Sequence, residues 1–234
     1  MSSKLDQLMG RASEALTRMD YLACEGLCLE ALAAARQAGD WPYYARILLP
    51  LQEARRQRRL IAADGPIHLG TSRRLSPDRW LSSLRTGCLL LTRPHTVEDA
   101  RQIDDEARAE GRHIEVLLAD NDLDTEPYRL VSYRGPQVTC LAEAPPAAWR
   151  DIWLAPGERP EPDADADVEP GKTPADWFID ATEALGDAAV AHVSAAPGDA
   201  RRIGELEAML QVVPDHEILH QRLGDAARAM DAAA

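Results

Sequence analysis

Two histidines and a glutamate near the end of the chain have a spacing that suits zinc chemistry. His216, Glu217 and His220 spell H-E-x-x-H. Histidines four residues apart lie on one face of a helix, so both imidazoles can bind the same zinc ion, and the glutamate can act as general base toward a metal-bound water. The pattern therefore indicates a hydrolytic site with Glu217 as the catalytic residue and His216 and His220 as metal ligands.

Taken alone, these five residues resemble the zincin metallopeptidases, which implies a zinc-dependent peptidase. The surrounding sequence departs from that family. Pro214 places His216 in the opening turn of its helix, only Asp225 and Asp231 follow as carboxylate ligands, and the sequence has no H-x-x-G-x-x-H continuation. We therefore expect no catalytic residue, no metal and no cofactor, and we keep the zinc peptidase as an alternative.

A second group of polar residues follows two predicted strands in the middle of the chain. Residues 88–92 and 114–119 are apolar runs of strand length, and Thr96 with Asp99 predicts a capping box that begins a helix between them. This strand–helix–strand order predicts a parallel pair, whose carboxyl ends meet at one edge of the sheet. Arg93, His95, Asp120 and Asp122 would meet there, so a pocket for a polar small molecule is a further alternative to ordinary loop solvation.

The start of the chain has the periodicity of paired amphipathic helices. Tyr21, Cys24, Cys28 and Ala31 step by three, four and three residues, which places them on one buried side of a helix. We expect Glu25 and Glu30 to point away from that side. Apolar residues within 5–16 predict an earlier helix, so the two helices form an antiparallel hairpin.

The segment from Leu5 to Ala38 resembles one tetratricopeptide repeat, and Leu223, Gly224 and Ala227 resemble the first helix of another. The resemblance implies stacked helices with a groove for a partner segment. A generic helical hairpin stays open, because the aromatic and Leu-Gly signature of a first helix is missing from the N-terminal unit.

A third helix is predicted over residues 41–63, with Pro50 inside it. Tyr43, Tyr44 and Arg46 near its start are our candidate docking surface for a protein partner, and packing against the next domain is the alternative. The arginines at 55, 56, 58 and 59 are expected to form a solvated helix face.

Composition limits the classes of function. The formal net charge is −13 at pH 7, and most of it lies in residues 155–234, which hold 17 acidic and 6 basic residues. This balance disfavours binding to phosphate backbones. No apolar run reaches membrane-span length and the start lacks a signal-peptide pattern, so we expect no nucleic acid, no membrane and a cytoplasmic location. The four cysteines lack zinc-knuckle spacing and are expected to be reduced.

These patterns together predict an α+β fold that is mostly helical, with tetratricopeptide-like helical segments flanking a small α/β domain that contains a βαβ unit. We divide the chain into a helical domain at 1–64, the α/β domain at 65–154, an acidic, proline-rich linker at 155–172 and a helical segment at 173–234. The expected function is that of a non-enzymatic scaffold that holds another protein or a peptide segment.

Overall fold

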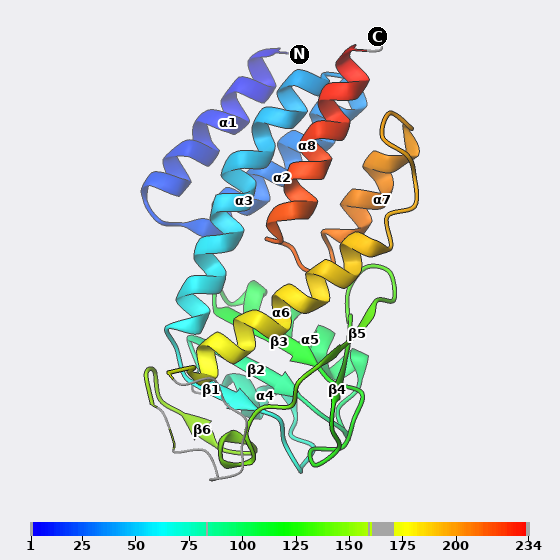
Figure 1. The fold of residues 1–234 in the computed structure, drawn as a ribbon. Helices are drawn as coiled ribbons and strands as arrows, with labels where there is room; N and C mark the ends of the chain where they lie inside the picture. The colour runs from blue at the N-terminus through cyan, green and yellow to red at the C-terminus, as the bar shows by residue number, and fades with distance from the viewer. Residues whose placement is uncertain (1, 83, 159, 161–170, 233–234) are drawn as a thin grey trace. The chain divides into compact units, whose positions relative to one another are not determined.

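The computed structural model describes residues 2–82, 84–158, 160 and 171–232 (Figure 1). The fold is α+β and mostly helical, which confirms the predicted class. Internal contacts divide the chain into two compact units, residues 1–58 with 189–234 and residues 59–188. The units therefore follow different boundaries from the four predicted segments. Residues 161–170 of the predicted linker lie outside the described part, and none of the described helices is long and apolar enough to cross a membrane.

The helices of the described chain follow the predicted order closely. Their bounds are α1 Ser2–Thr17, α2 Tyr21–Ala38, α3 Trp41–Ala63, α4 Pro77–Leu81, α5 Val97–Ala109, α6 Pro174–Ala191, α7 Arg201–Met209 and α8 Glu217–Ala232. A short 3₁₀ turn spans Ala147–Trp149. Helix α3 continues through Pro50.

Helix α2 packs against α1 in the first unit, and its ends have clear physical causes. Asp20 accepts a hydrogen bond from the Ala23 N–H at 3.2 Å, and Gly39 ends the helix in the left-handed conformation with φ +68°. The four residues predicted to share a face, Tyr21, Cys24, Cys28 and Ala31, are all buried. Glu25 is buried as well, so the expectation that it points away from the core is wrong.

The second unit contains a four-stranded sheet in the order β3-β2-β1-β6. Its strands are β1 Ile67–Leu69, β2 Thr86–Leu91, β3 His113–Leu118 and β6 Trp153–Leu154, with β6 antiparallel to β1 and the other pairs parallel. Between β2 and β3, α5 starts at the predicted capping box of Thr96 and Asp99. Leu89, Leu91 and Ile103 pack in one buried cluster, so the βαβ unit has the expected apolar core.

Two further strands form a β-hairpin that does not extend this sheet. Strands β4 (Tyr128–Val131) and β5 (Thr139–Ala142) form a separate antiparallel pair. An isolated bridge from Ala119 to Leu130 links β4 to the end of the main sheet. Strand β3 ends at Leu118, just before this bridge, so β3 and β4 do not pair along their lengths.

Gly65 gives a direct test of how closely β1 approaches β2. A Cβ at Gly65 would lie 2.6 Å from Thr86 Oγ1 and 2.8 Å from the Gly87 nitrogen. We expect Gly65→Ala to lower the free energy of unfolding by about 1–3 kcal/mol, because backbone must move. Gly26→Ala in α2 meets open space and should raise it by ~0.5–1 kcal/mol. Urea denaturation followed by circular dichroism measures both, and equal shifts would contradict the close approach.

Candidate functional site

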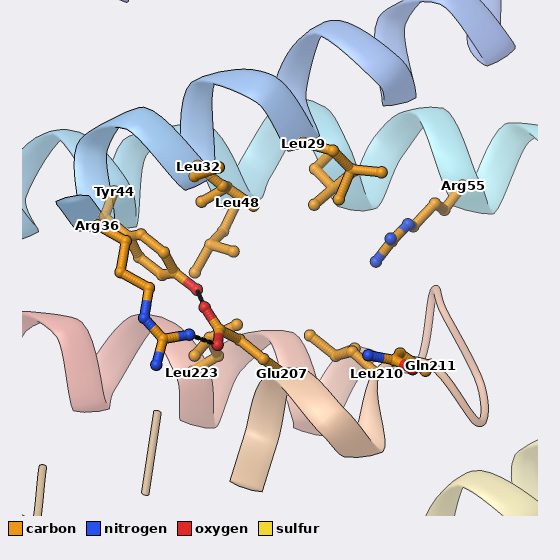
Figure 2. A pocket seen from close by; sticks show the side chains of 12 residues that line it. Leu29, Leu32, Arg36, Tyr44, Leu48, Arg55, Glu207, Leu210, Gln211 and Leu223 are labelled. Atoms are coloured by element: carbon orange, nitrogen blue, oxygen red, sulfur yellow. Dashed lines mark hydrogen bonds and ion pairs between the residues drawn. The ribbon is translucent and has the colours of Figure 1, made fainter. Parts of the chain in front are cut away.

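The first unit contains an open pocket with a volume of about 330 Å³ (Figure 2). Helices α2, α3 and α8 line it together with α7 and the turn that follows α7. The lining residues are Leu29, Leu32, Ala33, Arg36, Tyr44, Leu48, Leu51, Arg55, Glu207, Leu210, Gln211 and Leu223. Segments from both ends of the chain therefore build this pocket.

Helical spacing explains why the middle of the pocket is apolar. On α2 the lining residues begin with Leu29 and Leu32, and on α3 they include Leu48 and Leu51, each pair three residues apart and so on one helix face. Leu210 and Leu223 close the opposite wall. Figure 2 shows the leucine side chains pointing into the space between the helices. The pocket can therefore accept aliphatic groups.

A hydrogen-bonded cluster forms one end of the pocket (Figure 2). The Tyr44 hydroxyl donates to Glu207 Oε1 at 2.6 Å, and the Arg36 guanidinium forms an ion pair with Oε2 of the same carboxylate. Burial raises the pKa of Tyr44 to about 12, so its hydroxyl stays a donor at neutral pH. These polar groups can orient a ligand at the rim.

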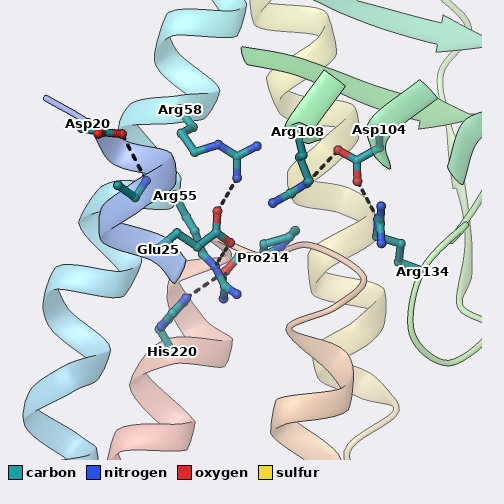
Figure 3. Close-up of polar contacts among 10 residues, drawn as sticks. Asp20, Glu25, Arg55, Arg58, Asp104, Arg108, Arg134, Pro214 and His220 are labelled. Carbon is teal, nitrogen blue, oxygen red and sulfur yellow. Dashed lines mark hydrogen bonds and ion pairs between the residues drawn. The ribbon is translucent and has the colours of Figure 1, made fainter. Parts of the chain in front are cut away.

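A buried ion cluster that includes Arg55 lies at the other end of the pocket (Figure 3). Arg55 Nε donates to Glu25 Oε1 at 2.8 Å, and Arg58 Nη1 donates to Glu25 Oε2 at 2.5 Å. Arg55 Nη1 also donates to the Pro214 carbonyl at 2.9 Å. We call Glu25, Arg55 and Arg58 the Glu25 clamp, because one carboxylate of α2 holds two guanidinium groups of α3.

The arginines of α3 therefore differ from the predicted solvated face. Arg58 is 2% exposed and Arg59 is 6% exposed, whereas Arg56 remains on the surface. Arg59 pairs with Glu183 of α6, and both residues belong to the second unit. The prediction was wrong because carboxylates of other helices pair with Arg55, Arg58 and Arg59, and sequence spacing along α3 carries no sign of them.

The H-E-x-x-H residues separate into buried and exposed groups. His216 and His220 are 2% and 3% exposed, and His216 directly precedes α8. Glu217 is exposed and accepts a hydrogen bond from Gln221, so it lies on a different side from the two imidazoles. His220 Nε2 is 2.9 Å from the Pro214 carbonyl oxygen. Among the described residues, no group of three or more histidine, cysteine, aspartate and glutamate side chains is placed to hold a metal ion.

The three residues predicted as a docking surface point to two different sides of α3. Tyr43 donates to Asp6 of α1 at 2.7 Å, and the Arg46 guanidinium lies 5.3 Å from the centre of the Tyr43 ring. Tyr44 is 1% exposed and lines the pocket instead. Of the three, Tyr44 alone therefore takes part in the candidate site.

The polar residues predicted at the sheet edge are brought together only in part. Arg93 donates to Asp120 at 2.6 and 2.9 Å, and Arg129 pairs with the other carboxylate oxygen. The hydrogen bonds from Arg93, and then those from Arg129, lower the pKa of Asp120. His95 is buried, its ring centre 6.0 Å from that of Trp80, and Asp122 is exposed. Arg93 and Asp120 do meet at this edge, as an ion pair, whereas His95 is buried, with its Nε2 accepting from the Leu75 N–H at 3.5 Å and its Nδ1 4.0 Å from Asp99 Oδ2.

Sequence reasoning missed most of the pocket and the whole Glu25 clamp. A signal was present for the leucines of α2 and α3, whose spacing marks a second apolar stripe. No such signal exists for Glu207, which reaches Tyr44 across 163 positions of sequence. Comparisons of the chain with protein-family models, with curated proteins and with solved structures find no match. The site is therefore described by its own geometry.

Removing the Glu25 carboxylate tests the clamp. Glu25→Ala leaves two buried guanidinium groups without their shared partner, so we expect the free energy of unfolding of the first unit to fall by about 3–5 kcal/mol. Glu30→Ala is the matched control, because Glu30 lies on the same helix and its exposed carboxylate pairs with Lys4 at 3.4 Å. That variant should change stability by less than about 0.5 kcal/mol. Urea denaturation compares the two, and a similar effect of both would contradict the role of the clamp.

Proposed function

We propose that this chain is a non-enzymatic interaction protein whose first unit binds an aliphatic segment of another protein. The observation that carries the proposal is the leucine-lined, open pocket between α2, α3, α7 and α8. Helical surfaces commonly bind partner segments through apolar side chains set into a groove. The mechanism would be contact and orientation, with no bond made or broken.

The dimensions of the pocket support a side chain or a short segment as its occupant. A volume of about 330 Å³ is at the small end of the range for ligand pockets, on the order of 300–1,000 Å³. One or two aliphatic side chains suit such a space. Full burial of a leucine or valine side chain stabilises a complex by about 1.5–3 kcal/mol, so the pocket would act as an anchor point within a larger contact.

The polar end of the pocket supports a partner with a defined orientation. Arg36 and Glu207 are partly exposed, with side-chain exposures of 47% and 28%, and their ion pair stands at the rim. A peptide backbone or polar side chain can bind there while its aliphatic neighbour enters the leucine-lined middle. The net charge of −13 disfavours strongly acidic partners.

A phage-displayed peptide library tests the proposal with a defined probe. We expect peptides selected on the full chain to carry an aliphatic residue at a fixed position. Ala33→Trp fills the mouth of the pocket from an exposed position on α2 and should weaken the selected peptides by about 10-fold or more, the equivalent of one buried aliphatic side chain. Fluorescence anisotropy with a labelled peptide measures the affinity.

Ala23→Trp provides the matched control. It adds the same indole at another exposed alanine of α2 that does not line the pocket. Its affinity for the selected peptides should equal that of the wild type. Peptides that bind all three proteins equally, or a selection that yields no pocket-dependent peptide, would refute the proposed function.

A further inference from the structure

His220 lies in α8 near the corner between α7 and α8, and it shares a backbone partner with Arg55 of α3, which lines the pocket. Its ring is buried, and its Nε2 is 2.9 Å from the Pro214 carbonyl oxygen. The same oxygen accepts a hydrogen bond from Arg55 Nη1 at 2.9 Å (Figure 3). One backbone carbonyl therefore ties the corner to both His220 and the Glu25 clamp.

The chemistry of this contact fixes which tautomer the neutral imidazole adopts. A carbonyl oxygen can only accept, so Nε2 must carry the hydrogen, and a neutral ring then has a bare lone pair on Nδ1. In the part of the chain that the structure describes, the buried Nδ1 has no hydrogen-bond partner. Protonation would place a buried N–H⁺ group there without an acceptor, which costs free energy.

Most of the charges around His220 disfavour a positive charge on its ring. Arg55 of α3 and the His216 imidazole oppose a positive charge on the ring, whereas Asp215 of the corner favours one. Glu25 of α2 is engaged with Arg55 and Arg58. Burial is the largest effect, and with these charges it lowers the pKa of His220 to about 4.

We propose that His220 is an acid-sensitive latch, whose protonation releases the α7–α8 corner and so dismantles the peptide pocket. Leu210 and Gln211 line the pocket just before this corner, Leu223 lies one helical turn after His220, and Arg55 is held by the corner carbonyl. Opening the corner therefore removes part of the pocket wall. Opening of the corner does not depend on any ligand, whereas the loss of peptide binding rests on the proposed function.

The size of the effect follows from proton linkage. In an opened corner His220 returns to an ordinary pKa near 6.5, so the open state binds the proton more tightly and gains population as the pH falls below that value. With a closed-state pKa of about 4, the ratio of open to closed corner should rise roughly 30-fold between pH 7.5 and pH 5.

Hydrogen exchange of the full chain measures this ratio without any ligand. The reporters are peptides that cover the amides of Gln211, Val212 and His216, which are hydrogen-bonded within the corner. After correction for the pH dependence of intrinsic exchange, we expect opening in the wild type to rise roughly 30-fold at pH 5. His220→Gln, which keeps a donor toward the Pro214 carbonyl but cannot be protonated, should show no such rise.

His192→Gln is the control, because His192 is an exposed histidine of the same unit. It should respond to acid as the wild type does. An equal rise in the wild type and in His220→Gln would overturn the proposal. Should His220→Gln fail to fold at pH 7.5, nitrogen NMR of the wild type decides. A neutral Nε2–H tautomer in the folded protein at pH 6 supports the latch, and an imidazolium there overturns it.

A binding measurement separates this inference from the proposed function. The display-selected peptide should lose affinity at pH 5 for the wild type and for His192→Gln, and keep it for His220→Gln. If the exchange data agree with the latch but the display yields no pocket-dependent peptide, only the proposed function fails. If the peptide binds the pocket but neither exchange nor affinity depends on His220, only the latch fails.

Discussion

The first unit depends on the burial of one carboxylate among helices from both ends of the chain. Glu25 is 5% exposed and accepts hydrogen bonds from Arg55 and Arg58. A buried charge is tolerated only when it is paired and hydrogen-bonded, so the packing of α2 on α3 here must keep Glu25 opposite both arginines. Through Arg55, the same clamp fixes the Pro214 carbonyl and with it the corner before α8.

This constraint explains how a small set of helices can hold an open pocket. Without such a constraint the facing leucines would pack against each other and close the space, because removing apolar surface from water is favourable. The Glu25 clamp at one end and the hydrogen bond between Tyr44 and Glu207 at the other hold the helices at fixed positions. A pocket held at both ends is pre-organised, which lowers the entropic cost of binding.

In the second unit, by contrast, the polar side chains at the sheet edge bind one another. Arg93, Asp120 and Arg129 satisfy one another there, and His95 lies against Trp80 in the core. Polar residues that already form ion pairs with each other have little left to offer a ligand. The sheet edge, which the order of strands makes the default binding position in an open α/β sheet, is therefore a weaker candidate than the helical pocket.

The sequence by itself determined the local structure. Apolar spacing located α2, the pair of Thr96 and Asp99 located the start of α5, and apolar runs located β2 and β3, because these features depend on residues within a few positions of each other. Only the tertiary structure decided which polar groups meet. Glu25 and Arg55 are 30 positions apart and Tyr44 and Glu207 are 163 apart. Helical periodicity shows which face a residue occupies, but the partner across that face depends on how distant helices pack.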